Sequence, residues 1–256
     1  MKNTAIILAA GCGDRLQELT KDPKSLLTIN GKSLLDWHIS HLNILNFNKI
    51  IIVIGYKSEI IKRHIESLNY ETPIEFVQND DFRNKGNSYS MYLGILNTST
   101  VENLLVIDAD LIYEHKVISD FMKDKENDSI LIGEGSLEDV ECAKALVDND
   151  GFIRKTIDKR LVENDELINY NFIGEAIGMI KFSKSNRFNI INECEKFFNS
   201  TKNLKLNWEH LMNEYFIDNP MRSCLCTSNY WIEIDTKEDF FEAKELFNNI
   251  NIITKQ

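Results

Sequence analysis

Apolar residues in the first 110 positions alternate between short continuous runs and stretches with helical spacing. Continuous apolar runs are typical of strands buried on both faces, and apolar residues three or four apart are typical of helices with one buried face. The predicted strands are Ile6–Ala10, Lys49–Ile54, Ile74–Val77 and Leu104–Ile107, and the predicted helices between them are Ser33–Asn46, Ser58–Leu68 and Ser88–Leu96. This alternation predicts a parallel sheet with right-handed crossovers and helices on both faces.

The pattern changes in the second half of the chain. A hairpin is predicted there, because Ala145–Val147 and Phe152–Thr156 flank the turn residues Asp148-Asn149-Asp150-Gly151. The other predicted elements are strands at Ala176–Phe182, Ser223–Cys226 and Trp231–Ile234 and helices at Ser183–Phe198, Trp208–Phe216 and Lys237–Phe247, the first and last capped by Ser183 and Thr236. No internal repeat or linker-like stretch separates the halves, which predicts a single α/β domain over residues 1–256.

Composition and charge narrow the class of protein. With 43% hydrophobic residues and only 3 prolines, the chain has a globular composition, and its net charge of −11 argues against nucleic-acid binding. No apolar run reaches the ~18–20 residues of a membrane span, and Thr4–Ala10 reads as a buried strand rather than a signal peptide. The cysteines lack the spacing of a disulfide framework or zinc site, which predicts free thiols and a reducing, cytoplasmic location; they are Cys12, Cys142, Cys194, Cys224 and Cys226.

The strongest chemical signal lies directly after the first predicted strand. The segment Leu8-Ala9-Ala10-Gly11-Cys12-Gly13-Asp14-Arg15-Leu16 is followed by Pro23-Lys24-Ser25-Leu26-Leu27. Small residues and two glycines after a strand let backbone N–H groups approach a phosphate, to which Arg15 and Lys24 add positive charge. The segment lacks the third glycine of a Rossmann dinucleotide site and does not match a Walker loop. By itself it is also compatible with a tight turn beside two solvated basic residues.

Three aspartates are candidate ligands for Mg²⁺. Asp108 and Asp110 follow a predicted buried strand and, two positions apart, point the same way, while Asp235 ends another apolar segment. Mg²⁺ prefers a few carboxylate oxygens together with phosphate. Either Asp108 or Asp110 could pair with Asp235 at such a site. Each alone is also compatible with a loop or helix-capping role.

The motif L-A-A-G-x-G-x-R-L…P-K-x-L-L resembles that of the nucleotidyltransferases that make NDP-sugars and CDP-alcohols. The resemblance continues through Gly55-Tyr56, Gly86-Asn87-Ser88-Tyr89-Ser90, Val106-Ile107-Asp108-Ala109-Asp110 and Trp231-Ile232-Glu233-Ile234-Asp235-Thr236. It implies that a glycine loop wraps a nucleoside triphosphate, that Arg15 and Lys24 hold its phosphates, and that Asp110 and Asp235 bind Mg²⁺. The implied loop residues are Leu8, Ala9, Ala10, Gly11 and Gly13.

The chain departs from the family pattern in two places. Asp14 stands where the family usually has Ser or Thr, and it would place a negative charge beside the phosphates. The segment from Leu19 to Lys24 is one residue shorter than the family pattern, which bears on the reach of Lys24.

The helix start Asn87-Ser88-Tyr89-Ser90 and the run Ile107-Asp108-Ala109-Asp110 are similar to those of cytidylyltransferases that activate phosphocholine and related compounds. This similarity implies CTP as the donor, with Asn87 and Ser88 at the nucleotide. Gln78 is a candidate for reading the cytosine edge, and a solvated strand end is the equally weighted alternative. An NDP-sugar or inositol-1-phosphate nucleotidyltransferase is the alternative function, and a non-catalytic nucleotide-binding regulator is the second alternative.

Cation chemistry suggests where the acceptor binds. An ammonium group binds aromatic faces with a carboxylate nearby. The C-terminal half offers Tyr170, Glu175, Trp208, Glu209 and Trp231, which favours phosphocholine, phosphoethanolamine or 2-aminoethylphosphonate as acceptor. Each tryptophan alone is equally compatible with core packing.

The predicted fold class is α/β: a Rossmann-like, mostly parallel sheet with helices on both faces and a C-terminal β/α lid for the acceptor. The nucleotide-binding half spans about residues 1–115 and the acceptor-binding half about 116–256. The expected partners are CTP, Mg²⁺ and a small phosphorylated or phosphonate acceptor, with neither nucleic acid nor membrane.

Overall fold

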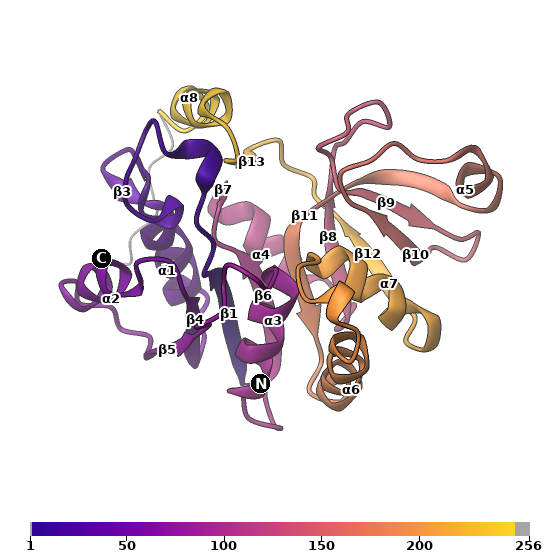
Figure 1. Ribbon diagram of the computed structural model, residues 1–256, viewed down its shortest axis with the longest axis horizontal. Helices are drawn as coiled ribbons and strands as arrows, with labels where there is room; N and C mark the ends of the chain where they lie inside the picture. Colours follow the sequence, from indigo (N-terminus) through magenta and orange to yellow (C-terminus); the bar gives the residue numbers. More distant parts are fainter. Residues whose placement is uncertain (1, 249–256) are drawn as a thin grey trace.

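A nine-stranded sheet runs through both halves of the chain in the computed structural model, which describes residues 2–248 (Figure 1). Its strand order is β5-β4-β1-β6-β11-β8-β12-β10-β9. Its strands are β1 (Asn3–Ala9), β4 (Lys49–Ile54), β5 (Ile74–Gln78), β6 (Asn103–Asp108), β8 (Ser129–Gly133), β9 (Lys144–Val147), β10 (Phe152–Ile157), β11 (Asn171–Phe182) and β12 (Met221–Leu225). Two small sheets pair β2 (Thr28–Ile29) with β3 (Lys32–Ser33) and β7 (Leu111–Tyr113) with β13 (Trp231–Glu233).

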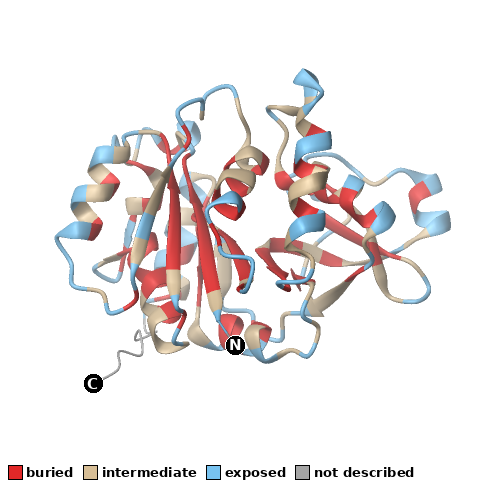
Figure 2. Cartoon of the chain, turned by 90° about the horizontal axis from the view of Figure 1, so that it is seen from below, coloured by how far each residue is buried: buried red, intermediate tan, exposed pale blue. Residues whose placement is uncertain are grey.

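Helices cover both faces of this sheet. They are α1 (Leu34–Ile44), α2 (Ser58–Glu66), α3 (Asn87–Leu96), α4 (His115–Lys123), α5 (Asn164–Asn169), α6 (Arg187–Phe198), α7 (Trp208–Asp218) and α8 (Lys237–Leu246), with 3₁₀ turns at Asp14–Leu16, Lys24–Leu26 and Thr201–Asn203. Alternate residues of β1 face the two sides of the sheet: Ile6 lies in the core cluster that includes residues of α3, α6 and α7, whereas Ile7 lies in the cluster that includes residues of α1, α2 and α4. The central strands are accordingly buried along most of their length (Figure 2).

The N-terminal four strands are parallel, as the sequence predicts, because β1 pairs in parallel with both β4 and β6, and β4 with β5. Beyond β6 the sheet is mixed. The long β11 runs antiparallel to β6 at one end and to β9 at the other, so a single strand ties the two halves together. The α/β class is confirmed, and the sheet as a whole is mixed rather than parallel throughout.

The small sheet of β7 and β13 returns the C-terminal segment to the N-terminal half. Glu233 pairs with Leu111, and the Ile234 N–H donates to the Asp110 carbonyl at 3.1 Å. Helix α8 then packs on the N-terminal half, where Phe247 meets Trp37 edge to face. This pairing carries Asp235 to the end of β6.

Most predicted elements are confirmed within one to three residues, although β11 begins at Asn171, five residues before the predicted Ala176. Six strands and helices were not predicted: β2, β3, β7, α4, β8 and α5. The predicted Ser183 cap is wrong. Helix α6 begins at Arg187, because the Ser183 hydroxyl donates to Asp128 at 2.7 Å and Ser183–Asn186 forms a turn. The Thr236 cap on α8 is confirmed, since its side chain accepts from the Asp239 N–H at 3.2 Å.

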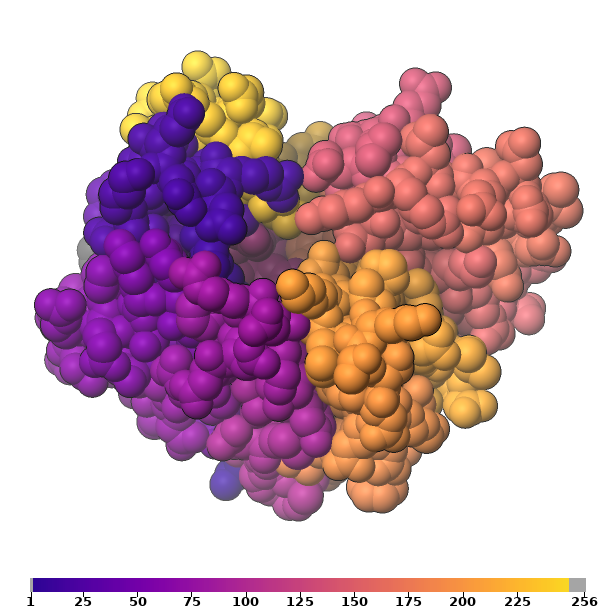
Figure 3. Space-filling view, in the orientation of Figure 1, coloured from indigo at the N-terminus to yellow at the C-terminus, as the bar shows by residue number. Residues whose placement is uncertain are grey.

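Among residues 2–248, no helix combines the length and the apolar character that crossing a membrane requires. All five cysteines are free thiols, as predicted. A hollow opens between the N-terminal half and the C-terminal lobe (Figure 3). The loops at the carboxyl ends of β1 and β6 lead into it.

Candidate active site

The glycine loop follows β1 and lines one side of the cleft. Gly13 adopts a left-handed conformation (φ 62°), and a Cβ there would lie 2.8 Å from the Cβ of Lys24. Glycine at this position therefore lets Lys24 pack directly against the loop. Leu8, Ala9, Gly11 and Gly13 line a cavity together with Lys24, Ser25, Ala109 and Asp110.

Lys24 lies between two of the predicted metal ligands. Its Nζ is 2.7 Å from Asp110 Oδ2 and 2.7 Å from Asp235 Oδ1. Burial alone would lower the pKa of Lys24, but the charges of Asp110 and Asp235 outweigh it and raise the pKa above its ordinary value. The ammonium is therefore a permanent positive charge in the cleft, and the shortened segment before Lys24 does not keep it from the site.

Arg15 also faces carboxylates. Its guanidinium pairs with Asp235 and lies 3.1 Å from Glu141 Oε2, on the loop between β8 and β9. Burial opposes ionisation of Asp235, but Lys24 and then Arg15 lower its pKa below the ordinary value. Asp14 is exposed and accepts from Gln17 Nε2 at 2.8 Å, so it takes no part in this cluster.

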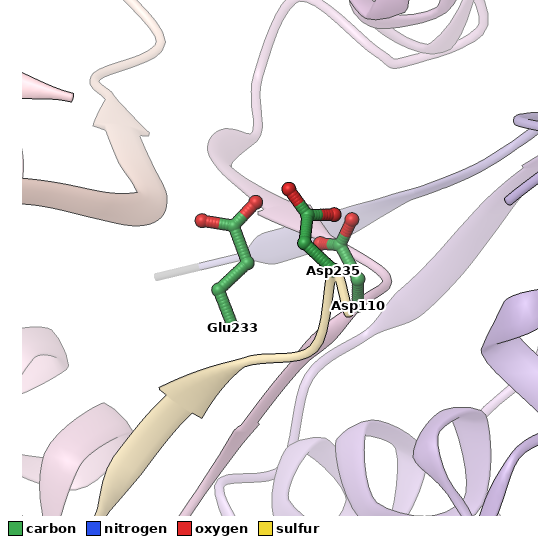
Figure 4. Close-up of side chains that lie close together, drawn as sticks. All are labelled: Asp110, Glu233 and Asp235. Atoms are coloured by element: carbon green, nitrogen blue, oxygen red, sulfur yellow. The ribbon is translucent and has the colours of Figure 1, made fainter. Parts of the chain in front are cut away.

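Three carboxylates meet at the junction of β6 with β13 (Figure 4). Asp110, Glu233 and Asp235 can each offer one oxygen, and these oxygens lie within 4.8 Å of one another. The Asp110 Oδ1 atom is buried without a hydrogen-bond partner. An unpartnered buried carboxylate oxygen beside two further carboxylates fits a hard divalent cation such as Mg²⁺. Glu233 was not predicted, although its position two residues before Asp235 on a strand was a signal for it.

Glu233 retains exposed surface as a residue, while its carboxyl group lies in the cleft. Loss of water around that group, followed by the charges of Asp110 and Asp235, holds its pKa well above the ordinary value. A cation bound among the three carboxylates would reverse this effect.

Asp108 is not part of this group of ligands. Its Oδ2 accepts a 2.8 Å hydrogen bond from the indole Nε1 of Trp208, whose side chain is only 1% exposed. Burial and then the charge of Asp110 raise the pKa of Asp108 to about 8, against the opposing effect of the Trp208 bond. The indole N–H of Trp208 thus contacts the N-terminal half of the chain at Asp108, and the ring is packed in the core.

A second cavity continues from the glycine loop along the start of α3. Its lining includes Phe82, Lys85, Gly86, Asn87 and Asp108. Gln78 is exposed at the end of β5 and lies outside both lining sets. Asn87 lines the cavity, and its Oδ1 accepts a hydrogen bond from the backbone N–H of Trp208 at 2.8 Å. Ser88 is buried, and its hydroxyl donates to the Leu206 carbonyl at 2.6 Å.

The remaining predicted acceptor residues are dispersed. Glu209 is buried beside Asp158 and Asp108; burial and these charges raise its pKa well above the ordinary value, and its Oε2 has no hydrogen-bond partner. Glu175 is half-buried against Gly135, and Trp231 packs on Gly133. Tyr170 is the residue directly after α5. Helix α5 lies at the outer edge of the C-terminal half in Figure 1.

Two further residues facing the cleft were not predicted. Glu141 reaches Arg15 across the cleft, as described above. Lys159 is exposed, follows β10 and has a backbone φ of 50°. Its positive charge acts to lower the pKa of Asp235 and that of Glu209. Neither residue stands in a periodic pattern or a motif that would have marked it.

Comparison with known proteins supports the family suggested by the motif. Residues 5–137, just over half of the chain, match the MobA-like NTP transferase domain. The chain is 38% identical to the choline-phosphate cytidylyltransferase of Streptococcus pneumoniae over 107 residues, which cover 41% of this chain and 44% of that protein. It is 26% identical to the CTP:phosphoglutamine cytidylyltransferase of Campylobacter jejuni over 195 residues, which cover 70% of this chain and 72% of that protein. The matched region thus spans less than half of the streptococcal relative.

Solved structures share the fold over nearly the whole chain. The structure of CTP:phosphocholine cytidylyltransferase from Streptococcus pneumoniae has a TM-score of 0.76 at 24% identity and covers 96% of this chain and 100% of that one. The inositol-1-phosphate CTP transferase of T. maritima has a TM-score of 0.73 at 21% identity, with 98% of each chain covered. With the glycine loop, Lys24 and the carboxylates assembled in one cleft, the chain belongs to the family of MobA-like NTP transferase domains.

Proposed function

We propose that this protein is a Mg²⁺-dependent cytidylyltransferase that transfers CMP from CTP to a small phospho- or phosphono-amino alcohol and releases pyrophosphate. The observation that carries the proposal is the position of Lys24 between Asp110 and Asp235, beside a glycine loop at the end of β1. This arrangement supplies backbone donors, fixed positive charge and cation ligands at one point.

The reaction needs alignment and charge neutralisation. An oxygen of the acceptor phosphate or phosphonate attacks the α-phosphorus of CTP in line, and the bond from that phosphorus to the β-phosphate oxygen breaks. Because the attacking oxygen is already anionic, no general base is required. Mg²⁺ bound by Asp110 and Asp235, with Glu233 beside them, would supply charge neutralisation at the triphosphate.

The basic residues of this chain share the phosphate charge. Arg15 is positioned to hold the oxygens of the departing pyrophosphate, and Lys24 those of the α-phosphate and acceptor. Both cations are paired with carboxylates in this structure, so nucleotide binding exchanges carboxylate partners for phosphate oxygens. Lys159 brings a further positive charge from the acceptor half, suited to the acceptor phosphate.

CTP is the proposed donor because both cytidylyltransferase relatives resemble this chain and because the Asn87-Ser88 helix start borders the second cavity. A cationic acceptor is favoured by the buried, adjacent carboxyl groups of Glu209 and Asp158, because an ammonium group beside them would offset the cost of their ionisation. The aromatic contribution to acceptor binding is smaller than the sequence suggests, because the Trp208 ring is buried.

The test is pyrophosphate release with Mg²⁺, each of the four NTPs and a panel of acceptors. The panel contains phosphocholine, phosphoethanolamine, 2-aminoethylphosphonate, inositol-1-phosphate and glucose-1-phosphate. Release with CTP and one amino-alcohol compound is the expected result. Release only with inositol-1-phosphate would favour the activity named for the T. maritima neighbour, and release only with UTP or dTTP and the sugar phosphate would favour an NDP-sugar enzyme. Binding of CTP without release with any acceptor would favour a regulator.

A further inference from the structure

Asp108 is the carboxylate of the cleft that the proposed metal site does not use. It ends β6 and lines the second cavity, which shares Leu8, Gly11 and Asp110 with the cavity of the glycine loop. Asp110 lines both cavities and belongs to the proposed metal site, and Phe82, Gly86 and Asn87 also line the second cavity. Asp108 therefore lines a cavity that adjoins the proposed metal-and-phosphate site.

From this placement we infer that Asp108 accepts a hydrogen bond from a ribose hydroxyl of the bound nucleotide, and that Trp208 positions its carboxylate for this contact. The inference rests on the proposed function, because it requires a nucleoside triphosphate with its phosphates at Lys24 and Arg15. In any such nucleotide the ribose lies between phosphates and base. A carboxylate beside vicinal ribose hydroxyls accepts from them, as acidic residues do in other nucleotide sites.

The carboxylate of Asp108 is held from one side only. Its Oδ2 takes the 2.8 Å bond from Trp208 Nε1, and this is the one hydrogen bond that the Asp108 carboxylate makes within residues 2–248. One oxygen is thus committed to the protein and the other is left for a ligand. Gly178 adopts φ 71°, and a Cβ there would lie 3.1 Å from both the Cβ and the Oδ2 of Asp108, so glycine leaves the Asp108 side chain its space.

Trp208 is fixed in turn by the nucleotide half. Its backbone N–H donates to Asn87 Oδ1 at 2.8 Å, and the Gly86 N–H donates to the Leu204 carbonyl at 2.7 Å. A Cβ on Gly86 would lie 2.3 Å from the Leu206 carbonyl oxygen, so this seam between the halves is closely packed. The buried indole therefore has one orientation, and Trp208 acts as a positioning residue for Asp108.

The experiment measures binding of CTP, 2′-deoxy-CTP and 3′-deoxy-CTP with Mg²⁺ by calorimetry, in the absence of acceptor. Loss of the hydrogen bond to Asp108 predicts that the wild-type protein binds CTP about tenfold more tightly than at least one deoxy analogue. In Asp108→Ala the affinities for the three nucleotides are expected to lie within about threefold of one another. The variant should still bind the deoxy analogue that the wild type disfavours with about the affinity of the wild type. Asp120→Asn, an exposed aspartate on α4, controls for the loss of one negative charge.

Trp208→Phe tests the positioning role, because it keeps an aromatic ring and removes the N–H. It is expected to reduce the preference for CTP by about threefold or more, and thermal unfolding measures any loss of stability separately. A lower melting temperature with unchanged preference would assign Trp208 a structural role only and overturn that part. Equal wild-type affinities for all three nucleotides, or an unchanged preference in Asp108→Ala, would overturn the ribose contact. If no nucleoside triphosphate binds, the proposed function fails as well, so the two failures are distinguishable.

Discussion

Lys24 and Asp235 are 211 residues apart in the chain, yet the Lys24 ammonium lies 2.7 Å from the Asp235 carboxylate. The same ammonium lies 2.7 Å from Asp110. One cation thus contacts the aspartate that follows β6 and the aspartate that follows β13. Because removing any one of these charges changes the balance of the others, the site behaves as a unit.

Neutralising a proposed metal ligand should abolish most of the activity. We expect Asp110→Asn or Asp235→Asn to lower turnover by ~10²-fold or more, because each removes a charge that holds the cation at the transferring phosphate. The measurement is pyrophosphate release at limiting Mg²⁺, with circular dichroism to verify folding. Asp120→Asn on α4 is the matched control. Unchanged turnover in both site variants would discard the metal assignment.

Mg²⁺ binding should be detectable without any reaction. Since a ligand that binds the folded state stabilises it, millimolar Mg²⁺ is expected to raise the melting temperature of the wild-type protein. Glu233→Gln should reduce that shift, because one of the three clustered carboxylates is lost. Glu238→Gln, an exposed residue on α8, should leave the shift as it is in the wild type. Equal shifts in Glu233→Gln and wild type would remove Glu233 from the site.

Glu141 competes with nucleotide phosphates for Arg15. Its carboxylate lies 3.1 Å from the guanidinium, and the two side chains are 63% and 46% exposed. Exposed pairs contribute ~0–1 kcal/mol, so Glu141→Gln should tighten CTP binding by only about two- to threefold. Calorimetry at low salt provides the measurement. Glu138→Gln in the same loop removes an equal charge, and an equal gain in that variant would point to general electrostatics instead.

Buried histidines should make stability depend on pH. Burial and the neighbouring His115 lower the pKa of His41 from 6.5 to about 3, and burial lowers that of His38 to about 4. Because the unfolded chain binds these protons first, stability is fully present above pH 6.5 and falls as the pH drops toward 4. Each histidine contributes up to ~1.4 kcal/mol per pH unit in this window.

Urea unfolding at pH 7.5, 6 and 5 measures this slope in the wild-type protein and in His41→Asn. The variant should lose less stability on acidification than the wild type, even if it is less stable at pH 7.5. His210→Asn, whose side chain is 41% exposed, is the control. Identical slopes in the wild type and His41→Asn would contradict the buried-histidine origin.

The sequence by itself determined the features that depend on neighbouring residues. Apolar spacing located β1, β4, β6 and most helices, because a buried strand or amphipathic helix leaves its period in the chain. The glycine loop, Arg15 and Lys24 were identifiable because phosphate binding by backbone donors needs small residues at fixed local spacing. The match of residues 5–137 to the family model confirms the family that this local motif suggested.

Only the tertiary structure decided which side chains meet. The three-residue pairing of β13 with β7 brings Glu233 and Asp235 to Asp110, and strands that short leave no readable period. Trp208 was expected at an acceptor, but its ring is in the core and its N–H is bonded to Asp108, a choice made by packing of α7 against α3 and β10. Long-range hydrogen bonds and charge pairs depend on how distant elements dock, and that information is not contained in the local spacing of residues.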